Sequence, residues 1–254
     1  MHRNIVIGPP GTGKTTFLKN KVDKIIKEQK AQPNEIGYFS FTVKAAEEIR
    51  NRVTNKEWSE AELKKMFPYF CTLHSLAYKC LRLEANEIMD ELDYMELSDM
   101  TGRKFVNKMK KGNGIDISMP TAQSRYQDTI NLAYAKYPHD EDRLIKIFRE
   151  VKLSDYGARN TIMQMDKDLS NFKRDRHKLE YVDYFNSFLE CKNPPPLKYL
   201  FIDEAQDLSA HQWMVVDMIQ TISKPIETYI AGDDDQAIFR WAGADIEHFI
   251  AMAK

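Results

Sequence analysis

The sequence predicts an α/β protein in which a parallel β-sheet, with helices on both faces, is interrupted by a mostly helical inserted subdomain. Three observations lead to this prediction. A phosphate-binding pattern follows an apolar run near the N-terminus, short β-type and helical segments alternate at both ends of the chain, and the central stretch lacks that alternation. Alternating strands and helices are typical of a sheet whose parallel strands are joined by helical crossovers.

The change in residue composition and in the strand–helix pattern along the chain predicts where the domains begin and end. Residues 1–83 form the first part of the sheet domain, residues 84–190 the helical insertion, and residues 191–254 the second part of the sheet domain. The insertion is rich in Met, Lys, Asp and Glu. The segment Asn193-Pro194-Pro195-Pro196 cannot continue a helix, so it marks the return to the sheet.

The individual elements follow from the period of the apolar residues. Runs such as Leu200-Phe201-Ile202 are apolar on both faces, as buried parallel strands are. The expected strands are Asn4–Gly8, Ile36–Phe41, Tyr69–Thr72, Tyr199–Asp203 and Ile226–Gly232. The expected helices include the one after the first strand, Val43–Val53, His74–Leu83, Ser209–Ile222 and a last one that begins near Asp245.

Composition narrows the class of protein only loosely. The 254 residues are 43% hydrophobic and 30% charged, which is typical of a soluble globular chain. The formal net charge is -1, so contact with a polyanion requires a local patch or groove. The three cysteines, Cys71, Cys80 and Cys191, form no C-x-x-C pair and predict no metal site. No apolar run approaches the roughly 20 residues of a membrane helix, so we expect a cytoplasmic protein.

The most informative stretch is a complete match to the phosphate-binding pattern GxxxxGK[ST]. It follows the apolar run Ile5-Val6-Ile7, and an amphipathic segment comes after it. In such a loop, backbone N–H groups and a helix N-terminus surround the β-phosphate, Lys14 contacts the β- and γ-oxygens, and Thr15 offers its hydroxyl to Mg²⁺. We expect nucleotide contacts from Gly8, Pro9, Pro10, Gly11, Thr12, Gly13, Lys14, Thr15 and Thr16.

Two further polar clusters follow apolar strands, at the end where an α/β sheet presents ligand-binding groups. After Phe201-Ile202, Asp203 is a candidate ligand of Mg²⁺ and Glu204 a candidate base that orients or deprotonates a water molecule. The alternative is that this pair merely caps the next helix. Farther along, the amide of Gln236 could contact a terminal phosphate or its attacking water, unless residues 233–236 form a solvated acidic turn.

Together with three other segments, these clusters resemble the UvrD/Rep/PcrA group of superfamily-one DNA helicases, in order and over most of the chain. Phe41–Ile49 is similar to the Phe-Thr-x-Lys-Ala-Ala signature of this family, Thr72–Ser75 to its Thr-x-His-Ser signature, and Asp203–Asp207 to its Asp-Glu-x-Gln-Asp box. Gly232–Phe239, followed by Trp241, is similar to the third motif. Val182–Phe185 more faintly resembles the segment that closes the inserted subdomain.

The resemblance implies a RecA-like, P-loop fold and an ATP-dependent DNA helicase that moves 3′ to 5′, with ATP and Mg²⁺ as cofactors. It implies that Lys14, Glu204 and Gln236 are catalytic and that Thr15 and Asp203 hold Mg²⁺. Gln206 would contact the nucleotide and connect it, with Gln236, to the DNA groove. The implied partners are single-stranded DNA and duplex junctions.

The family's DNA contacts carry over to six positions. Phe41 and Trp241 would stack on bases, and Thr42, Lys44, Thr72 and His74 would contact the backbone. Stacking suits a motor that steps along any sequence, because every base has a π-face. The other interpretation of the two aromatic residues is that they belong to the core. Two basic runs, Lys108–Lys111 and Lys173–Lys178, could guide DNA or form a solvated face.

The sequence departs from the family pattern at three places. Only Met1, His2 and Arg3 precede the first strand, which leaves no room for the upstream glutamine that reads adenine. Ala242 follows Trp241 where the family commonly has arginine. No segment resembles the second RecA-like domain with its arginine fingers, so we expect the 254 residues to bind nucleotide weakly and to unwind nothing.

Two other functions are compatible with parts of the pattern. An AAA+ or other P-loop ATPase that remodels protein would share the phosphate loop and Asp203-Glu204 but would need no aromatic residues in a DNA groove. A catalytically lapsed DNA-binding subunit of a nuclease-helicase complex would keep the fold without turnover. Binding of single-stranded DNA separates the first alternative from a helicase, and substitution of Glu204 separates the second.

Overall fold

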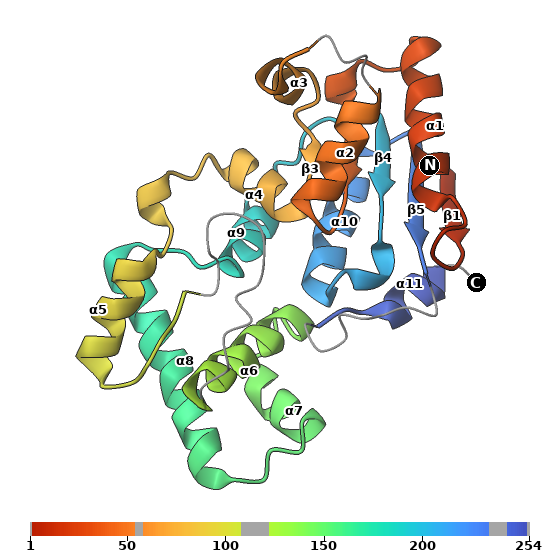
Figure 1. Cartoon of the computed structure of the whole chain (residues 1–254). Helices are drawn as coiled ribbons and strands as arrows, with labels where there is room; N and C mark the ends of the chain where they lie inside the picture. The colour runs from red at the N-terminus through yellow and green to blue at the C-terminus, as the bar shows by residue number, and fades with distance from the viewer. Residues whose placement is uncertain (1, 54–57, 108–121, 234–242, 253–254) are drawn as a thin grey trace. The chain divides into compact units, whose positions relative to one another are not determined.

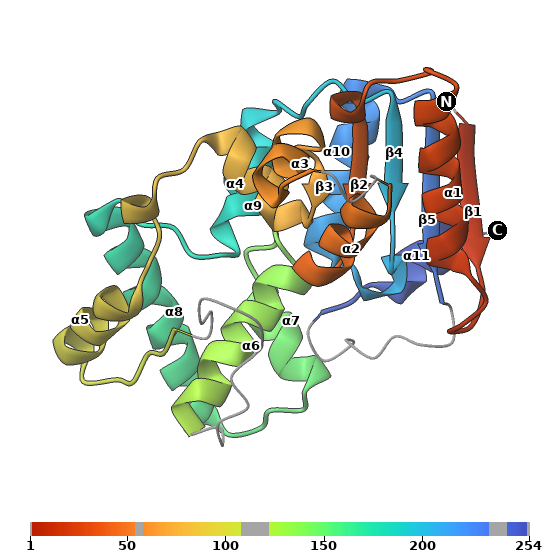
Figure 2. The same ribbon diagram turned by 45° about the horizontal axis from the view of Figure 1, so that its top comes forward.

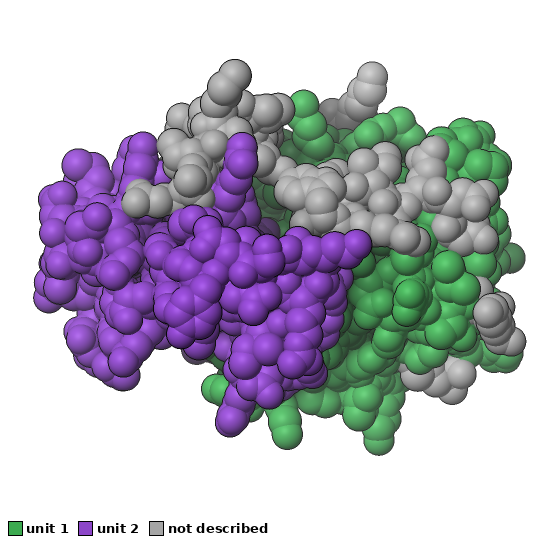
Figure 3. Space-filling view, turned by 90° about the horizontal axis from the view of Figure 1, so that it is seen from below, with its two compact units in different colours: residues 1–81, 187–254 green, residues 82–186 purple. Residues whose placement is uncertain are grey.

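The computed structural model describes residues 2–53, 58–107, 122–233 and 243–252 (Figure 1). The chain divides into two compact units, which Figure 3 shows in different colours. Unit 1 comprises residues 1–81 and 187–254, and unit 2 comprises residues 82–186. Unit 1 is therefore assembled from both ends of the chain.

Unit 1 is built on a five-stranded parallel sheet, so the predicted α/β fold is confirmed. Its strands are β1 (His2–Ile7), β2 (Ile36–Phe39), β3 (Phe70–Cys71), β4 (Tyr199–Ile202) and β5 (Glu227–Gly232). They lie in the order β1-β5-β4-β2-β3. The first and last strands of the chain are thus neighbours, and the carboxyl ends of all five meet at one edge.

The helices of unit 1 cover both faces of this sheet. They are α1 (Lys14–Lys27), α2 (Val43–Val53), α3 (Glu60–Met66), α4 (Leu73–Leu81), α10 (Ala210–Ser223) and α11 (Ile246–Met252), with the 3₁₀ turns η1 (Pro33–Glu35) and η3 (Ala205–Asp207). Because parallel crossovers are right-handed, the crossovers from β1 to β2 and from β2 to β3 place α1 and α2 on one face. The crossover from β4 back to β5 places α10 on the other (Figures 1 and 2).

The core of unit 1 forms where α1 and α2 pack on the sheet. Leu18 and Val22 of α1 are completely buried in one apolar cluster with aromatic side chains of the strands. The rings of Phe201 and Tyr229, on adjacent strands, stack with centroids 4.9 Å apart. This packing fixes the strand ends, and hence the loops that follow them, relative to α1.

Several elements differ by one or two residues from the expected bounds, and one helix was not expected. β2 ends at Phe39, two residues earlier than predicted, because its neighbours β3 and β4 end at Cys71 and Ile202 and no ladder continues beyond them. The short helix α3 was not predicted. Its N-terminus carries a capping box, in which Ser59 and Glu62 each accept a hydrogen bond from the other's backbone N–H.

Unit 2 is helical within its described residues. It contains η2 (Ala85–Glu87), α5 (Glu91–Thr101), α6 (Ala122–Lys136), α7 (Arg143–Glu150) and α8 (Tyr156–Arg176), and α9 (Asp183–Cys191) runs from unit 2 into unit 1. Side chains of α5 to α8 share one buried apolar cluster, which includes Leu97, Ile147 and Met165. Unit 2 thus has a core of its own.

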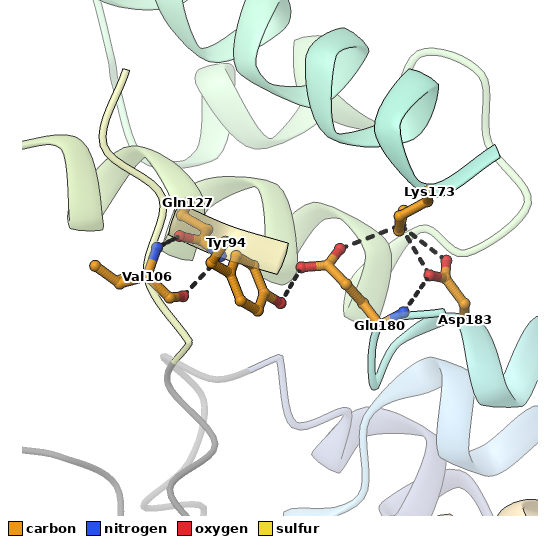
Figure 4. A network of polar contacts seen from close by, with 6 residues as sticks. All are labelled: Tyr94, Val106, Gln127, Lys173, Glu180 and Asp183. Atoms are coloured by element: carbon orange, nitrogen blue, oxygen red, sulfur yellow. Dashed lines mark hydrogen bonds and ion pairs between the residues drawn. The ribbon is translucent and has the colours of Figure 1, made fainter. Parts of the chain in front are cut away.

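A polar network near the end of unit 2 changes the interpretation of the second basic run (Figure 4). Lys173 donates hydrogen bonds to Glu180 at 3.1 Å and to Asp183 at 2.8 Å, and Tyr94 donates to Glu180 at 2.6 Å. Burial opposes the charge of Lys173, but Glu180 and Asp183 outweigh it and hold the pKa of the ammonium above its ordinary value. Lys178 pairs with Asp93 at 2.8 Å. Neither lysine is available to guide DNA, whereas residues 108–111 lie outside the described residues.

Candidate functional site

The phosphate loop joins the end of β1 to the start of α1. Gly11 and Gly13 have φ angles of 77° and 83°, in the left-handed region that a side chain disfavours. Gly13 caps α1, so backbone N–H groups at this helix N-terminus lie in the loop. The ammonium group of Lys14 folds back on the loop and donates hydrogen bonds to the carbonyl oxygens of Gly8 and Pro9. The sequence pattern therefore produces the strand, loop and helix that it predicts.

The end of β4 meets this loop at Asp203. Thr15 Oγ1 donates a hydrogen bond to Asp203 Oδ2 at 3.1 Å, although the two residues are 188 positions apart. Tyr38 donates its hydroxyl hydrogen to the same oxygen at 2.7 Å, and the backbone N–H of Glu204 donates to Oδ1 at 3.1 Å. The site is thus assembled from the two separate segments of unit 1.

The surroundings of Asp203 oppose its charge. The residue is only 2% exposed, and burial raises the pKa of its carboxyl above the ordinary value. The hydroxyls of Tyr38 and Thr15 lower this pKa, and the neighbouring charge of Glu204 raises it. Because a buried carboxylate is costly unless several donors stabilise it, this arrangement favours a cation at the same position.

The residues for which the sequence predicts DNA contacts follow the neighbouring strands at the same edge. Phe41 and Thr42 follow β2, and Lys44 lies in the first turn of α2. Thr72 follows β3, and His74 lies in the first turn of α4. Thr42 and Thr72 cap these helices, because their hydroxyls accept hydrogen bonds from Ala45 N and Ser75 N. The structure brings these five positions to one side of the sheet.

The capping role limits what the two threonines can contribute. Thr72 is also only 8% exposed. Lys44 is exposed and is therefore more accessible to a DNA backbone than Thr72. Desolvation within the fold, and then the nearby His211, lower the pKa of His74 well below its ordinary value. The imidazole of His74 is therefore neutral near neutral pH and can approach a phosphate only as a hydrogen-bonding group.

Comparison with known proteins identifies the family. A family model described as the UvrD/REP helicase N-terminal domain matches residues 1–254. The chain belongs to this family. It is 25% identical over 260 residues to the ATP-dependent DNA helicase PcrA of Staphylococcus epidermidis, a match that covers 98% of this chain and 33% of the relative. For PcrA of Staphylococcus aureus the identity is 25% over 262 residues, covering 98% and 34%. The chain spans about a third of the length of these curated relatives.

In this UvrD/REP domain, Glu204 and Gln206 are held by their own segment. Glu204 adopts a φ of 55°, a left-handed conformation uncommon outside glycine that is often found at functional sites. Gln206 is 4% exposed; it donates to Glu204 Oε2 at 2.8 Å and accepts from the backbone N–H of Asp233 at 3.0 Å. Its side chain thereby connects the ends of β4 and β5.

Two predicted residues of the UvrD/REP domain, Gln236 and Trp241, lie outside the described residues. Their proposed roles rest on the sequence pattern alone. The described residues before this segment end at Asp233, whose backbone N–H donates a hydrogen bond to Gln206.

Sequence reasoning missed Tyr38 and Asp207. A signal was available for Tyr38, because a tyrosine in a strand that is apolar on both faces needs a buried partner for its hydroxyl. Burial, together with Asp203, raises the pKa of Tyr38, which keeps the hydroxyl a hydrogen-bond donor. Asp207 belongs to the Asp-Glu-x-Gln-Asp box, but its partial burial depends on the packing of η3 and was not evident from the residues.

Asp207→Asn is expected to stabilise the protein by an amount that grows as the pH rises from about 4 through about 7 and then levels off. Burial, and then the charge of Glu204, raise the pKa of Asp207 from 3.8 to about 7. The folded state therefore keeps a proton that the unfolded chain has lost, so the wild type loses stability across this interval. Urea unfolding at several pH values measures the difference.

The matched control for this variant is Asp217→Asn, because the side chain of Asp217 is 49% exposed. A constant difference between Asp207→Asn and the wild type from about pH 4 to about pH 8 would contradict the raised pKa.

Proposed function

We propose that this chain is the ATP-binding motor half of a DNA helicase, which couples ATP hydrolysis to movement along single-stranded DNA in the 3′-to-5′ direction. The observation that carries the proposal is the hydrogen bond between Thr15 and Asp203, which joins the phosphate loop to the acidic end of β4. Family membership and the names of the relatives support the same conclusion.

Nucleotide binding follows from the phosphate loop. Backbone N–H groups and the N-terminus of α1 favour an anion at this position. Lys14 already lies over the loop, where its ammonium contacts two carbonyl oxygens, and these contacts would be exchanged for β- and γ-phosphate oxygens of ATP. A charge-assisted hydrogen bond to phosphate is stronger than one to a neutral carbonyl, so the exchange is favourable.

The residues present fit Mg²⁺. This ion prefers oxygen ligands, and it is usually held by one or two carboxylates with substrate phosphates and water. Thr15 and Asp203 offer a hydroxyl and a carboxylate whose oxygens lie 3.1 Å apart. When bound, the ion would neutralise charge on the β- and γ-phosphates. Tyr38 would hold the Asp203 carboxylate in place from the side of the sheet.

Glu204 and Gln206 then have distinct roles. Glu204 would accept a proton from the attacking water, because its carboxylate follows the Mg²⁺ ligand Asp203 directly and is oriented by Gln206 at 2.8 Å. Gln206 would transmit the state of the nucleotide to the segment after β5, since it bonds both Glu204 and the backbone of Asp233. Gln236, farther along that segment, would contact the γ-phosphate.

The DNA strand would cross the carboxyl edge of β2 and β3. Phe41 and Trp241 would stack on its bases, and Thr42, Lys44, Thr72 and His74 would position its backbone. Exposed Lys44 supplies positive charge at this edge. The protein-remodelling alternative has no use for such a surface, so DNA binding decides between the two functions.

Titration with a labelled oligo-dT, followed by fluorescence anisotropy at several salt concentrations, tests the proposal. The wild-type chain should bind with a negative salt slope, and Trp241→Ala should weaken binding by about 1–3 kcal/mol because one base loses its stacking partner. Trp58→Ala removes a tryptophan that is 47% exposed in unit 1 and should leave the affinity unchanged. No detectable binding of oligo-dT by the wild-type chain would favour an ATPase that acts on protein.

A further inference from the structure

A second polar cleft lies in unit 1, apart from the phosphate loop. It has a volume of about 490 Å³ and is bounded by α2, α3, β3 and α4. Val43 and Pro68 contribute apolar surface to its lining. Its polar lining includes four cations and two hydroxyls, from Arg50, Lys64, Lys65, Lys79, Thr72 and Ser75. None of the four cations belongs to the site described above.

The positive charge of this cleft is only partly neutralised. Arg50 Nη2 and Lys64 Nζ both approach Glu47 Oε1, at 3.8 and 3.9 Å, and both approach Glu60 Oε1, at 3.8 and 2.6 Å. Two cations thus share two carboxylates. Within the described part of the chain, Lys65 forms no ion pair, so it adds a charge that these carboxylates do not offset.

Lys79 adds a second such charge. Its ammonium donates a hydrogen bond to the carbonyl oxygen of Pro68 at 2.7 Å, which is a neutral partner. No ion pair of Lys79 occurs among the residues that the structure describes. A concave surface with two surplus positive charges and hydroxyl groups is suited to an anion, because the charges attract it and the hydroxyls can donate hydrogen bonds.

One cation of the cleft is built into the fold. The side chain of Arg50 is 4% exposed, so its guanidinium is a fixed part of the lining rather than a mobile surface group. Thr72 and Ser75 are also fixed, since their hydroxyl oxygens lie 3.0 Å apart at the capped end of α4. Fixed charges and donors lose little side-chain entropy when a ligand binds.

We infer that this cleft is a second anion site, which takes one phosphate group of a nucleic-acid strand. Lys65 and Lys79 would contact the phosphate oxygens, and Val43 and Pro68 would contact the sugar. The assignment to a strand rests on the proposed function. Thr72, a predicted DNA contact, lines the cleft, and so does Val43, which lies between the predicted contacts Thr42 and Lys44. A strand bound to those contacts could therefore continue into the cleft.

The test is the salt dependence of oligo-dT binding by a Lys65→Gln/Lys79→Gln variant. Loss of one phosphate contact to a single strand should reduce the salt slope by about 0.7 and weaken binding at low salt by roughly 5–10-fold. Lys24→Gln/Lys27→Gln, on the last turn of α1, removes the same charge from residues outside the cleft. This control should leave the slope at the wild-type value.

The outcomes separate the inference from the proposed function. If the wild type binds oligo-dT and Lys44→Gln weakens it, but the cleft variant retains the full slope, the inference is overturned and the proposed function stands. If the wild type binds no oligo-dT, both are overturned. Inorganic phosphate tests the other source of the anion: binding that is lost in the cleft variant, with an unchanged DNA slope, would assign the cleft to a free anion and overturn the strand assignment.

Discussion

Glu204→Gln is expected to reduce ATP turnover by about 10²–10⁴-fold while the dissociation constant for ATP stays unchanged. Glutamine keeps the shape of the side chain and an oxygen that can accept the hydrogen bond from Gln206. An amide cannot accept the proton of the attacking water, so only the chemical step should suffer. Phosphate release from saturating MgATP, measured with and without oligo-dT, gives the rate, and a fluorescent nucleotide analogue gives the affinity.

Lys14→Met provides the contrasting variant for this experiment. It removes the ammonium that would contact the β- and γ-phosphates, so the affinity for ATP should fall by the value of a charge-assisted hydrogen bond, about 1.5–3 kcal/mol. Lys14→Met thus tests the binding of ATP, whereas Glu204→Gln tests its hydrolysis. Unchanged turnover in Glu204→Gln would remove Glu204 from the mechanism and favour a subunit in which catalysis has lapsed.

Gly232→Ala is expected to destabilise unit 1 by about 1–3 kcal/mol and to weaken nucleotide binding, because an added methyl group has no space at this strand end. A Cβ atom at residue 232 would lie 2.6 Å from Phe249 Cζ and 2.9 Å from Gln206 Oε1. Phe249 is completely buried, so its ring cannot move into solvent. The backbone of Gly232 also accepts a hydrogen bond from Gly8 N at 3.3 Å, which transmits any shift to the phosphate loop.

Urea unfolding of single and double variants measures this effect. Combining Gly232→Ala with Phe249→Leu should recover part of the loss, and a coupling energy above about 0.5 kcal/mol would show that the two positions share one space. Gly157→Ala serves as the control: its Cβ would meet a side-chain oxygen of Asp155 at 3.3 Å in the first turn of α8, where alanine favours the helix. Wild-type stability in Gly232→Ala would show that the strand end is looser than the structure indicates.

Features that depend on a few consecutive residues were predicted correctly, whereas features that depend on neighbouring elements were not. The phosphate loop and the central strands were predicted because their patterns lie within a few consecutive residues and match one period. The end of β2 at Phe39 depends on where its neighbours end, and the partial burial of Asp207 depends on how η3 packs, so neither could be predicted from the local pattern. The buried ion pairs of Lys173 were not predicted, because this lysine meets Glu180 and Asp183 only in the folded unit.

The sequence by itself determined that a phosphate loop follows the first strand and that acidic residues end the fourth, since both are properties of short segments. Only the tertiary structure decided that Thr15 and Asp203 share a hydrogen bond and that Tyr38 supports the same carboxylate. It also decided that Lys65 and Lys79 face one cleft. The physical reason is that the order of strands in a sheet is selected by packing over the whole unit, and this order determines which distant side chains meet.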